Sequence, residues 1–397
     1  ADFVCYWFEK SRAAIKAKKL KRAGLVATQA IRAGRSREVL KAITATTKIA
    51  NAWSDEPWVN EGAAVRVSIV CFGDGFGSTN LDGAPVGSVG PDLKSGDQGF
   101  DLTRAVKVRS NAGVAFQGVI PRGAFVVSEE QAQAWAALPT NPNGMKNAAV
   151  LVPYVNASDI VRRPSHNWCL DFGQMTKVEA SMFEAPFAYA VEKIYPDRQK
   201  TNQAQARDFW WRHWCPRPEM TAALSPLDRY IATPRVSKYR IFVWLNGTVL
   251  PDSRLYAIAR DDDTTLGVLH SRIHEAWALA NASIHGDGDE GGRPTYNAAS
   301  CFETFPFPEG LTPDIPAQDY AENPHAVAIA DASRALVDAR DRWLNPPEWV
   351  DWQRTPEEVA AGFPARPVAK PGHEAALSKR TLTNLYNERP AWLDLLH

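Results

Sequence analysis

The chain has 397 residues, of which 45% are hydrophobic and 23% charged, and its 45 Lys and Arg balance its 45 Asp and Glu. These values are typical of an ordinary globular protein that is long enough for two or three domains. They exclude an intrinsically disordered composition, and they show no overall basic bias of the kind found in many nucleic-acid-binding proteins. No stretch reaches the roughly 20 consecutive apolar residues of a membrane-spanning helix.

Positive charge is nevertheless concentrated near the N-terminus. Residues 1–48 contain twelve Lys and Arg against three acidic residues. Such a local positive field favours contact with phosphates, and Arg32 and Arg35 are candidate contacts within it. For the basic run over residues 10–22, a solvated helix face is an equally good interpretation.

The five cysteines are widely separated, which suits a reducing, cytoplasmic compartment without a disulfide framework. His166-x-x-Cys169 and His213-x-Cys215 suggest a zinc site, but the two pairs lie in different predicted elements. We therefore favour buried thiols and ordinary histidines, and we expect no metal. The first residues lack a signal-peptide pattern and resemble the middle of a helix, so we expect the chain to begin inside a longer protein.

The first 72 residues alternate between predicted helices and strands. Helices are expected over 1–22 and 36–43, with Ser36 as the N-cap of the second, and strands over 24–31, 48–53 and 63–72. This order is typical of the closing half of an α/β sheet. An unpaired apolar edge is expected where the rest of the sheet would join.

The composition changes after this region. Residues 73–100 are rich in Gly and Asp and predict loops and a hairpin, whereas residues 114–310 combine short strands with aromatic-rich irregular segments. Within them, YRIFVWLNG (239–247) is expected to be a strand, and if the strand covers 236–244, Lys238 and Arg240 share one face. The segment 266–280 is expected to be a strand end that turns into a helix. Residues 311–397 are mainly helical, including a terminal helix over 374–396.

Three motifs suggest cofactor or ion chemistry, and in each case the context favours a simpler interpretation. FGDGFG (72–77) follows a strand but lacks the helix start that a cofactor loop needs, so it predicts a hairpin loop. NPPE (345–348) begins like the NPP-aromatic motif of amino-methyltransferases, but Glu348 replaces the aromatic residue and the segment predicts a helix end. HGDGDEGG (285–292) lacks the spacing of a calcium loop and predicts a surface loop.

Several segments, taken in order, resemble the MmeI-like DNA methyltransferases of type II restriction–modification systems. LGVLHSRIHEAW (266–277) and CFETFPFP (301–308) are similar to the end of the recognition domain in that family. Residues 1–15, 24–43 and 50–70 resemble the part of the catalytic domain that follows its NPP-aromatic motif. Residues 229–277 resemble the recognition domain, and 340–347 and 377–393 resemble the helical C-terminal region.

The resemblance implies the α/β rear half of a Rossmann-like methyltransferase sheet over 1–113, an α+β target-recognition domain over 114–310 and a helical C-terminal region over 311–397. It implies a sequence-specific DNA adenine methyltransferase that binds double-stranded DNA and uses S-adenosyl-L-methionine in the full-length parent, with a fused or associated endonuclease domain in some relatives. The cofactor loop and the NPP-aromatic motif should then lie before Ala1, so the catalytic residues stay unassigned and this chain alone is expected to be inactive.

A base methylase must extrude its target base and hold the opened duplex, which requires cations for phosphates and aromatic rings for stacking. The segment 229–240 and the helix start near 271 offer such residues, although a solvated face and a buried structural histidine remain alternatives. Together with the N-terminal arginines, the candidate DNA contacts are Arg32, Arg35, Arg235, Lys238, Arg240, Ser271, Arg272 and His274.

Two other functions compete with this interpretation. A non-catalytic DNA-binding specificity subunit would also lack the cofactor motif, but it would not be expected to start with half of an α/β sheet. An aromatic-rich hydrolase or carbohydrate-binding protein would use the 14 tryptophans, including those of DFWWRHW (208–214). It would need a paired-carboxylate or nucleophile signature, and the sequence presents none.

Overall fold

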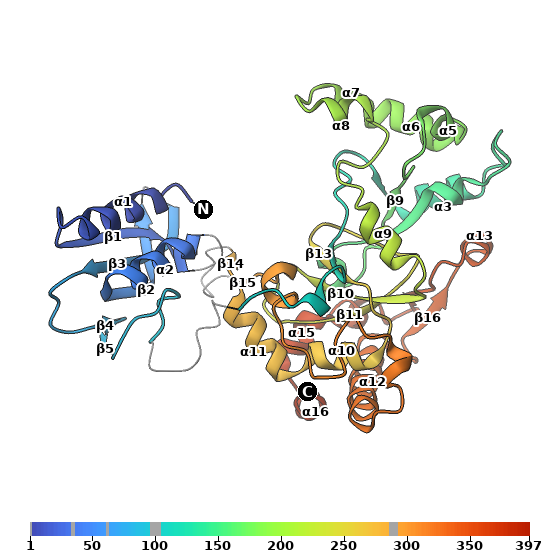
Figure 1. Ribbon diagram of the computed structural model, residues 1–397. Coiled ribbons are helices and arrows are strands. Elements are labelled where there is room, and N and C mark those ends of the chain that lie inside the picture. The colour runs from blue at the N-terminus through green and yellow to red at the C-terminus, as the bar shows by residue number, and fades with distance from the viewer. Residues whose placement is uncertain (1, 33–35, 61–62, 96–104, 286–292) are drawn as a thin grey trace. The chain divides into compact units, whose positions relative to one another are not determined.

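The computed structural model describes residues 2–32, 36–60, 63–95, 105–285 and 293–397 (Figure 1). The chain forms two compact units, one made of Ala1–Lys107 with Ala276–Phe305, and the other of Val108–Glu275 with Pro306–His397. Both combine mixed sheets with helices, as the α/β and α+β composition predicted. In the part of the chain described, no helix has both the length and the apolar character that crossing a membrane requires.

The first unit is built on a five-stranded sheet with the order β1-β3-β2-β4-β5. Strand β3 is antiparallel to both β1 and β2, and Arg22 and Lys48, at their starts, both lie opposite Gly73. Strands β1 and β2 therefore run parallel to each other, with a helix in their connection. The elements are α1 (Cys5–Lys16), β1 (Arg22–Thr28), a 3-10 turn (Gln29–Arg32), α2 (Arg37–Thr46), β2 (Lys48–Asn60), β3 (Ala63–Gly73), β4 (Asn80–Leu81), β5 (Ala84–Pro85), β14 (Ile284–His285), β15 (Arg293–Pro294) and a π-helix (Ala298–Phe302).

Helices α1 and α2 pack beside this sheet and form the core of the first unit (Figure 1). Phe8 of α1 and Phe72 of β3 are fully buried, and their rings stack with centroids 6.1 Å apart. Leu40 and Ile43, one turn apart on α2, are also fully buried because this spacing places them on the same helix face. The amphipathic pattern of the sequence thus accounts for both helices.

Several boundaries and one helix cap in the first unit differ from the predicted ones, and β2 extends to Asn60, well beyond the predicted end at residue 53. The first helix ends at Lys16 because Lys18 adopts a left-handed backbone conformation (φ 56°), which stops the helix before β1. Strand β1 ends at Thr28 and not at residue 31, since the next residues form a 3-10 turn. Ser36 does not cap α2 with its side chain, and its Oγ instead accepts a hydrogen bond from the Asp2 N–H at 3.3 Å.

Strand β1 is an edge strand of the sheet within the described residues. Its side chains alternate in exposure, so that Ala27 is buried while Val26 on the other face is 43% exposed. Within the described residues β1 thus ends the sheet on this side, and the apolar side chain of Val26 on one of its faces is open to solvent.

The second unit contains two four-stranded sheets, with the orders β11-β10-β13-β6 and β12-β8-β9-β7, and the hairpin β16-β17. Its strands are β6 (Ala115–Gln117), β7 (Val126–Val127), β8 (Leu151–Val155), β9 (Trp168–Leu170), β10 (Arg229–Pro234), β11 (Val243–Asn246), β12 (Leu250–Pro251), β13 (Leu255–Ile258), β16 (Val350–Gln353) and β17 (Arg366–Ala369). Its helices are α3 (Glu129–Ala136), α4 (Ala157–Val161), α5 (Lys177–Ser181), α6 (Glu184–Lys193), α7 (Tyr195–Gln199), α8 (Ala204–Asp208), α9 (Pro218–Leu224), α10 (Asp263–His270), α12 (Pro324–Leu344), α13 (Pro356–Ala360), α14 (Glu374–Leu377), α15 (Leu382–Glu388) and α16 (Ala391–Leu396), and α11 (Arg272–Asn281) begins in this unit. Short 3-10 turns lie at Arg109–Asn111, Asn147–Val150 and Ala317–Tyr320.

One hydrophobic core runs through the second unit and includes residues on both sides of position 310. The rings of Trp168 and Phe363 meet edge to face with centroids 4.9 Å apart. Arg340 of α12 donates from Nη2 to the Phe242 carbonyl at 2.9 Å. The segments assigned by sequence to a recognition domain and to a helical region therefore share packing.

The segment 266–280 forms two helices, so the predicted strand end is wrong. Helix α10 begins at an N-cap, Asp262, whose carboxylate accepts the Thr265 N–H at 2.7 Å. Gly267 allows α10 to lie against α12, because a Cβ there would come within 2.6 Å of the Ile329 side chain. Ser271 takes an extended backbone conformation and separates α10 from α11.

Two further predicted elements are also corrected, and one is confirmed. The strand expected over 239–247 is confirmed only at β11, Val243–Asn246, and its extension back over 236–242 is wrong. The terminal helix over 374–396 is divided into α14, α15 and α16. The long helix α12 ends at Leu344 with Asn345 as its C-cap, so the helix end predicted at NPPE is confirmed.

Candidate nucleic-acid interface

The turn between β12 and β13 is held in place by a buried carboxylate, Asp252. Its Oδ1 accepts hydrogen bonds from the backbone N–H of Arg254 (2.8 Å) and from Arg254 Nε (2.7 Å), and its Oδ2 accepts the Tyr154 hydroxyl (2.5 Å). Burial together with the Asp252 charge raises the pKa of the Tyr154 hydroxyl well above its usual value, so Tyr154 remains a proton donor. The turn is thereby fixed relative to β8.

Strand β6 approaches this turn closely because residue 118 is a glycine. A Cβ at Gly118 would lie 2.2 Å from the carbonyl oxygen of Asp252, a distance that no side chain tolerates. The Gly118 N–H donates to the Leu255 carbonyl at 3.1 Å. The end of β6 and the turn before β13 therefore form one surface.

Three arginines and two neutral polar residues meet on this surface, and we call them the Arg217–Arg235 cluster: Gln117, Arg217, Arg235, Ser253 and Arg254. The Ser253 carbonyl accepts from Gln117 Nε2 at 3.0 Å and from Arg235 Nη1 at 3.1 Å. Arg217 Nη2 donates to Gln117 Oε1 at 3.2 Å. These bonds orient the guanidinium groups while leaving several of their N–H donors available.

The cluster carries an excess of positive charge. Within the described part of the chain, neither Arg217 nor Arg235 forms an ion pair with a carboxylate, whereas Arg254 is paired with Asp252. Arg217 and Arg235 are half-buried, which limits the conformational freedom of their side chains. A fixed guanidinium presenting several donors is suited to phosphate oxygens and to guanine edges.

Of the basic residues predicted in this region, the structure brings only Arg235 into the cluster. Lys238 is exposed, and its Nζ donates to Asn387 Oδ1 on α15 at 3.2 Å. Arg240 is 7% exposed and donates from Nη1 to the Thr233 hydroxyl (3.0 Å) and the Pro234 carbonyl (2.5 Å). The prediction that Lys238 and Arg240 share a face is wrong, because the segment is not a strand and Arg240 turns inward.

The three residues predicted near the start of α11 differ in exposure. Ser271 Oγ accepts the His274 N–H at 3.2 Å and thereby serves the helix start, while Arg272 is exposed. His274 is fully buried, and its Nδ1 hydrogen-bonds the Leu269 carbonyl at 2.8 Å. Burial lowers the pKa of His274 to about 3, so it is a neutral packing residue in this fold.

Arg32 in the first unit is partly neutralised. Its Nη2 lies 3.0 Å from Asp55 Oδ2, and Arg66 Nε lies 2.6 Å from the other oxygen of the same carboxylate. Arg35 lies outside the described residues. The HGDGDEGG loop, apart from His285, lies outside them as well.

The glycine loop after β3 does not have the shape of a cofactor cradle. The next regular elements are the short strands β4 and β5, so no helix start follows the loop. A Cβ at Gly73 would lie 2.4 Å from the Lys21 carbonyl oxygen, and this close approach to β1 explains the glycine. Arg22 occupies the loop, donating to the Asp74 carbonyl at 3.0 Å and stacking on Phe76. S-adenosylmethionine therefore does not fit this loop.

Two residues of the suggested zinc pairs do meet in the core of the second unit. Cys169 Sγ lies 3.4 Å from His213 Nε2, and Asp171 Oδ1 lies 3.8 Å from His213 Nδ1. The thiol is fully buried, which raises its pKa well above the usual value and keeps it protonated. Across the residues described, no three or more metal-binding side chains converge on one point.

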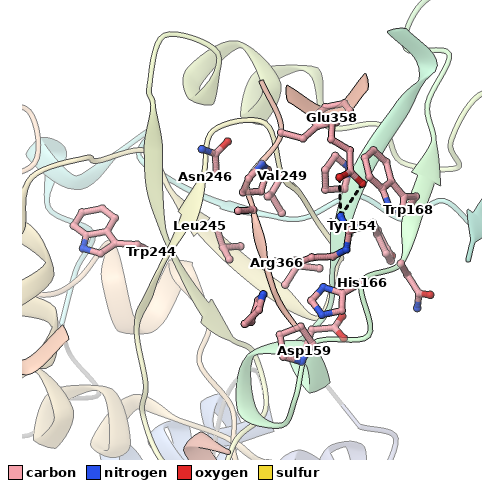
Figure 2. A pocket seen from close by; sticks show the side chains of 18 residues that line it. Tyr154, Asp159, His166, Trp168, Trp244, Leu245, Asn246, Val249, Glu358 and Arg366 are labelled. Carbon is pink, nitrogen blue, oxygen red and sulfur yellow. Dashed lines mark hydrogen bonds and ion pairs between the residues drawn. The ribbon is translucent and has the colours of Figure 1, made fainter. Parts of the chain in front are cut away.

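A separate pocket of about 270 Å³ lies among β8, β9, β11 and the β17 region (Figure 2). Tyr154, Trp168 and Phe363 give it mainly apolar walls. Figure 2 shows Arg366 pointing toward Glu358, and the two side chains are joined at 2.7 Å. Arg366 is the arginine of this lining, and its charge is already paired with Glu358 and Glu129, so the pocket offers a phosphate no arginine without a counter-ion.

Four residues of the Arg217–Arg235 cluster have no counterpart among the residues predicted from sequence: Gln117, Arg217, Ser253 and Arg254. The left-handed backbone at Arg217 (φ 55°), directly before Pro218, gives no sequence signal by itself. Gly118 between two apolar segments was the usable clue, since a glycine in a strand region often marks a close backbone approach.

No protein-family model matches the sequence, and no curated protein matches it either. Among solved structures, the type IIL restriction–modification enzyme MmeI in complex with DNA is similar over 100% of this chain, with a TM-score of 0.66 and 19% sequence identity. The match covers 51% of the MmeI chain, so the present chain spans about half the length of that enzyme. The type IIG restriction endonuclease BpuSI aligns at a TM-score of 0.33 and 10% identity, over 94% of this chain and 47% of that one.

The likeness to MmeI bears out the resemblance seen in the sequence at the level of fold. It extends over both compact units and includes the helical C-terminal elements. At 19% identity it concerns the arrangement of the chain and leaves the role of each side chain to be argued from the geometry.

Proposed function

We propose that this chain is the DNA-recognising portion of a sequence-specific DNA adenine methyltransferase of a restriction–modification system. In the full-length parent, residues 1–113 would complete the catalytic sheet, 114–310 would read the duplex, and 311–397 would support the reading domain. The parent would transfer a methyl group from S-adenosyl-L-methionine. The observation that carries the proposal is the fold likeness, over the whole chain, to MmeI, which was solved in complex with DNA.

The strand directions in the sheet of the first unit support the proposal that residues 1–113 form the rear half of a Rossmann-like sheet. Parallel strands β1 and β2 are connected through α2, and β3 lies between them in the opposite direction. A crossover helix between parallel strands is the basic unit of such sheets. The unpaired edge of β1 is the position at which further parallel strands would join.

The Arg217–Arg235 cluster supports duplex binding by the second unit. Phosphate contacts supply most of the affinity for DNA, and arginines near base edges supply much of the sequence discrimination. We propose Arg235 and Arg217 as the central contacts, with the exposed Lys238 and Arg272 as additional phosphate contacts. Buried Arg240 and His274 act as support for the fold in this proposal.

Methyl transfer would depend on residues other than the glycine loop and the NPPE segment of this chain. The former is occupied by Arg22, and the latter is the C-terminal end of α12. We therefore expect that calorimetric titration of the chain with S-adenosylmethionine gives no saturable low-micromolar isotherm. A saturable isotherm in that range would contradict the proposal that the parent binds S-adenosylmethionine with residues outside this chain.

The test of DNA binding is fluorescence anisotropy of the whole chain with a labelled duplex at several salt concentrations. We expect binding at about 50 mM salt and a linear fall of log K with log salt concentration. Arg235→Gln and Arg217→Gln should each lower the slope by about one if the side chain contacts a phosphate. A base-reading arginine would instead cost roughly 1–3 kcal/mol at a single base position.

The matched control is Arg334→Gln. Arg334 is an exposed arginine of the same unit, but it already pairs with Asp263 at 3.1 Å and with Asp331. It should leave both affinity and slope unchanged. Absence of duplex binding by the unmodified chain at low salt would refute the proposed function. A parent that binds but does not methylate would indicate the non-catalytic specificity subunit.

A further inference from the structure

A second group of arginines, which shares no residue with the Arg217–Arg235 cluster, lines a groove of about 630 Å³. The groove is formed by the turn before Phe125, the helix α7 with the loop that follows it, and Trp214. In Figure 1, α7 and α8 mark its position at the top of the larger unit. Its polar lining includes Arg122, Asp197, Arg198, Lys200 and Asn202, and we call it the Arg122–Arg198 groove.

Arg198 is the central residue of this groove. It is only 4% exposed, and its Nη2 donates to the carbonyl oxygens of Pro121 (2.8 Å) and Arg212 (3.1 Å). Its Nε and Nη1 are buried without a hydrogen-bond partner. Because these two atoms are closed to solvent and Nη2 already donates to two carbonyl oxygens, Arg198 contributes to the groove a buried positive charge that no carboxylate pairs with within the described residues.

A second arginine reinforces the positive charge. Arg122 is exposed, and its guanidinium stacks on Trp214 at 4.1 Å, while Arg198 lies 5.3 Å from the same ring. Burial and the neighbouring charge of Arg122 lower the pKa of Arg198 to about 10. The positive charges of Arg122 and Arg198, both close to the Trp214 ring, therefore repel each other.

No carboxylate neutralises this pair within the described residues. The acidic residue of the groove, Asp197, is bonded to Lys200 at 2.8 Å on the exposed rim. The lining thus contains three cations and one carboxylate. The backbone of Arg122 is left-handed (φ 50°), a conformation that is unfavourable for a residue other than glycine, and Gly123 (φ 103°) follows it in the same turn.

From this arrangement we infer that the Arg122–Arg198 groove is a binding site for a phosphate group, with the exposed Arg122 as its donor and the buried charge of Arg198 behind it. The guanidinium of Arg122 matches the acceptor geometry of phosphate oxygens, and two arginines without a counter-ion match the charge of the group. The phosphate belongs either to the backbone of bound DNA, which rests on the function proposed above, or to a free phosphate or nucleotide. The chemistry of recognition is the same in both cases.

The first arm of the test titrates the whole chain with inorganic phosphate by calorimetry in a chloride buffer. Arg122→Gln should weaken binding about tenfold, because it removes one charge-assisted interaction. Arg122 is exposed and forms no hydrogen bond in the described structure, so this variant should fold normally. Arg198→Met is the second variant, with circular dichroism to verify its fold, and Arg334→Gln is the control.

The second arm measures duplex binding of the same variants against salt concentration. A slope lowered by about one in Arg122→Gln assigns the site to a DNA phosphate. Weakened phosphate binding with an unchanged duplex slope assigns it to a free phosphate or nucleotide. If phosphate binding and the duplex slope are both unaffected by Arg122→Gln and Arg198→Met, the inference is wrong. The phosphate arm gives its answer even if the chain fails to bind duplex DNA.

Discussion

Acid should destabilise the second unit through a buried histidine, His274. The side chain is fully buried, its Nδ1 hydrogen-bonds the Leu269 carbonyl, and the Arg240 charge acts on it in the same direction as burial. Burial lowers the pKa of His274 to about 3, whereas an unfolded histidine titrates near about 6.5. The unfolded chain therefore binds more protons between these two values, so the stability is complete above the upper value and falls as the pH falls toward the lower one.

The magnitude follows from proton linkage. Between pH 7 and pH 5 the unfolded histidine becomes almost fully protonated while the folded one stays neutral, which costs about 2 kcal/mol of unfolding free energy. His270 adds to this loss, because burial and the adjacent Arg340 hold its pKa well below the usual value. The loss is large compared with the roughly 5–15 kcal/mol that stabilises a typical domain.

The assay is urea denaturation followed by tryptophan fluorescence at pH 7 and pH 5. His274→Asn removes the titrating group while placing an amide near the position of Nδ1. Its unfolding free energy at pH 7 should be lower than that of the parent, but its loss on acidification should be about 2 kcal/mol smaller. His325→Asn, at an exposed position on α12, should behave like the parent. Equal pH dependence in the parent and in His274→Asn would refute the linkage argument.

Two further predictions concern stability and use the same urea assay. Gly73→Ala should destabilise the first unit by about 2 kcal/mol, because residue 73 has a positive φ (137°) and an added Cβ would collide with the Lys21 carbonyl oxygen. The control is Gly77→Ala, whose added Cβ would have no other atom within 4 Å. It should change the free energy of unfolding by less than about 0.5 kcal/mol. Equal effects of the two substitutions would contradict this reading of the loop. Arg366→Gln should cost about 3 kcal/mol, because it leaves the buried Glu358 carboxylate without its cation, and adding Glu358→Gln should recover part of that loss. A double variant no more stable than Arg366→Gln would remove the ion pair as the cause.

The sequence predicted most of the first unit, because its signals are local. The helix predicted over 36–43 corresponds to α2, and the strand predicted over 63–72 corresponds to β3. The glycine loop was also interpreted correctly, since its lack of a following helix can be seen in the chain itself. Boundaries were less accurate, as the left-handed residue Lys18 and the unused cap at Ser36 have no distinctive local pattern.

The second unit was less predictable because its elements depend on contacts distant in sequence. Apolar residues around Gly267 fit a buried strand or a buried helix equally well, and packing against Ile329 of α12 favours the helix. Arg240 seemed to continue the alternation of a strand, but bonds to Thr233 and Pro234 turn it inward. The cluster at Arg217 joins residues that are about one hundred positions apart, which no local pattern reveals.

The arginines of this chain show why a basic sequence pattern does not locate a nucleic-acid interface by itself. Arg32 belongs to the basic N-terminal region, yet the Asp55 carboxylate forms an ion pair with it and partly neutralises its positive charge. Arg217 and Arg198 lie outside that region, and within the described residues each bonds only neutral acceptors. An arginine already paired with a carboxylate gains little from a phosphate, since the first pair must be broken, whereas one held by carbonyl oxygens retains its full charge for the ligand. The cations that the proposed DNA contact can use are therefore those that folding leaves without a counter-ion, and within the described residues Arg217, Arg235, Arg122 and Arg198 meet that condition.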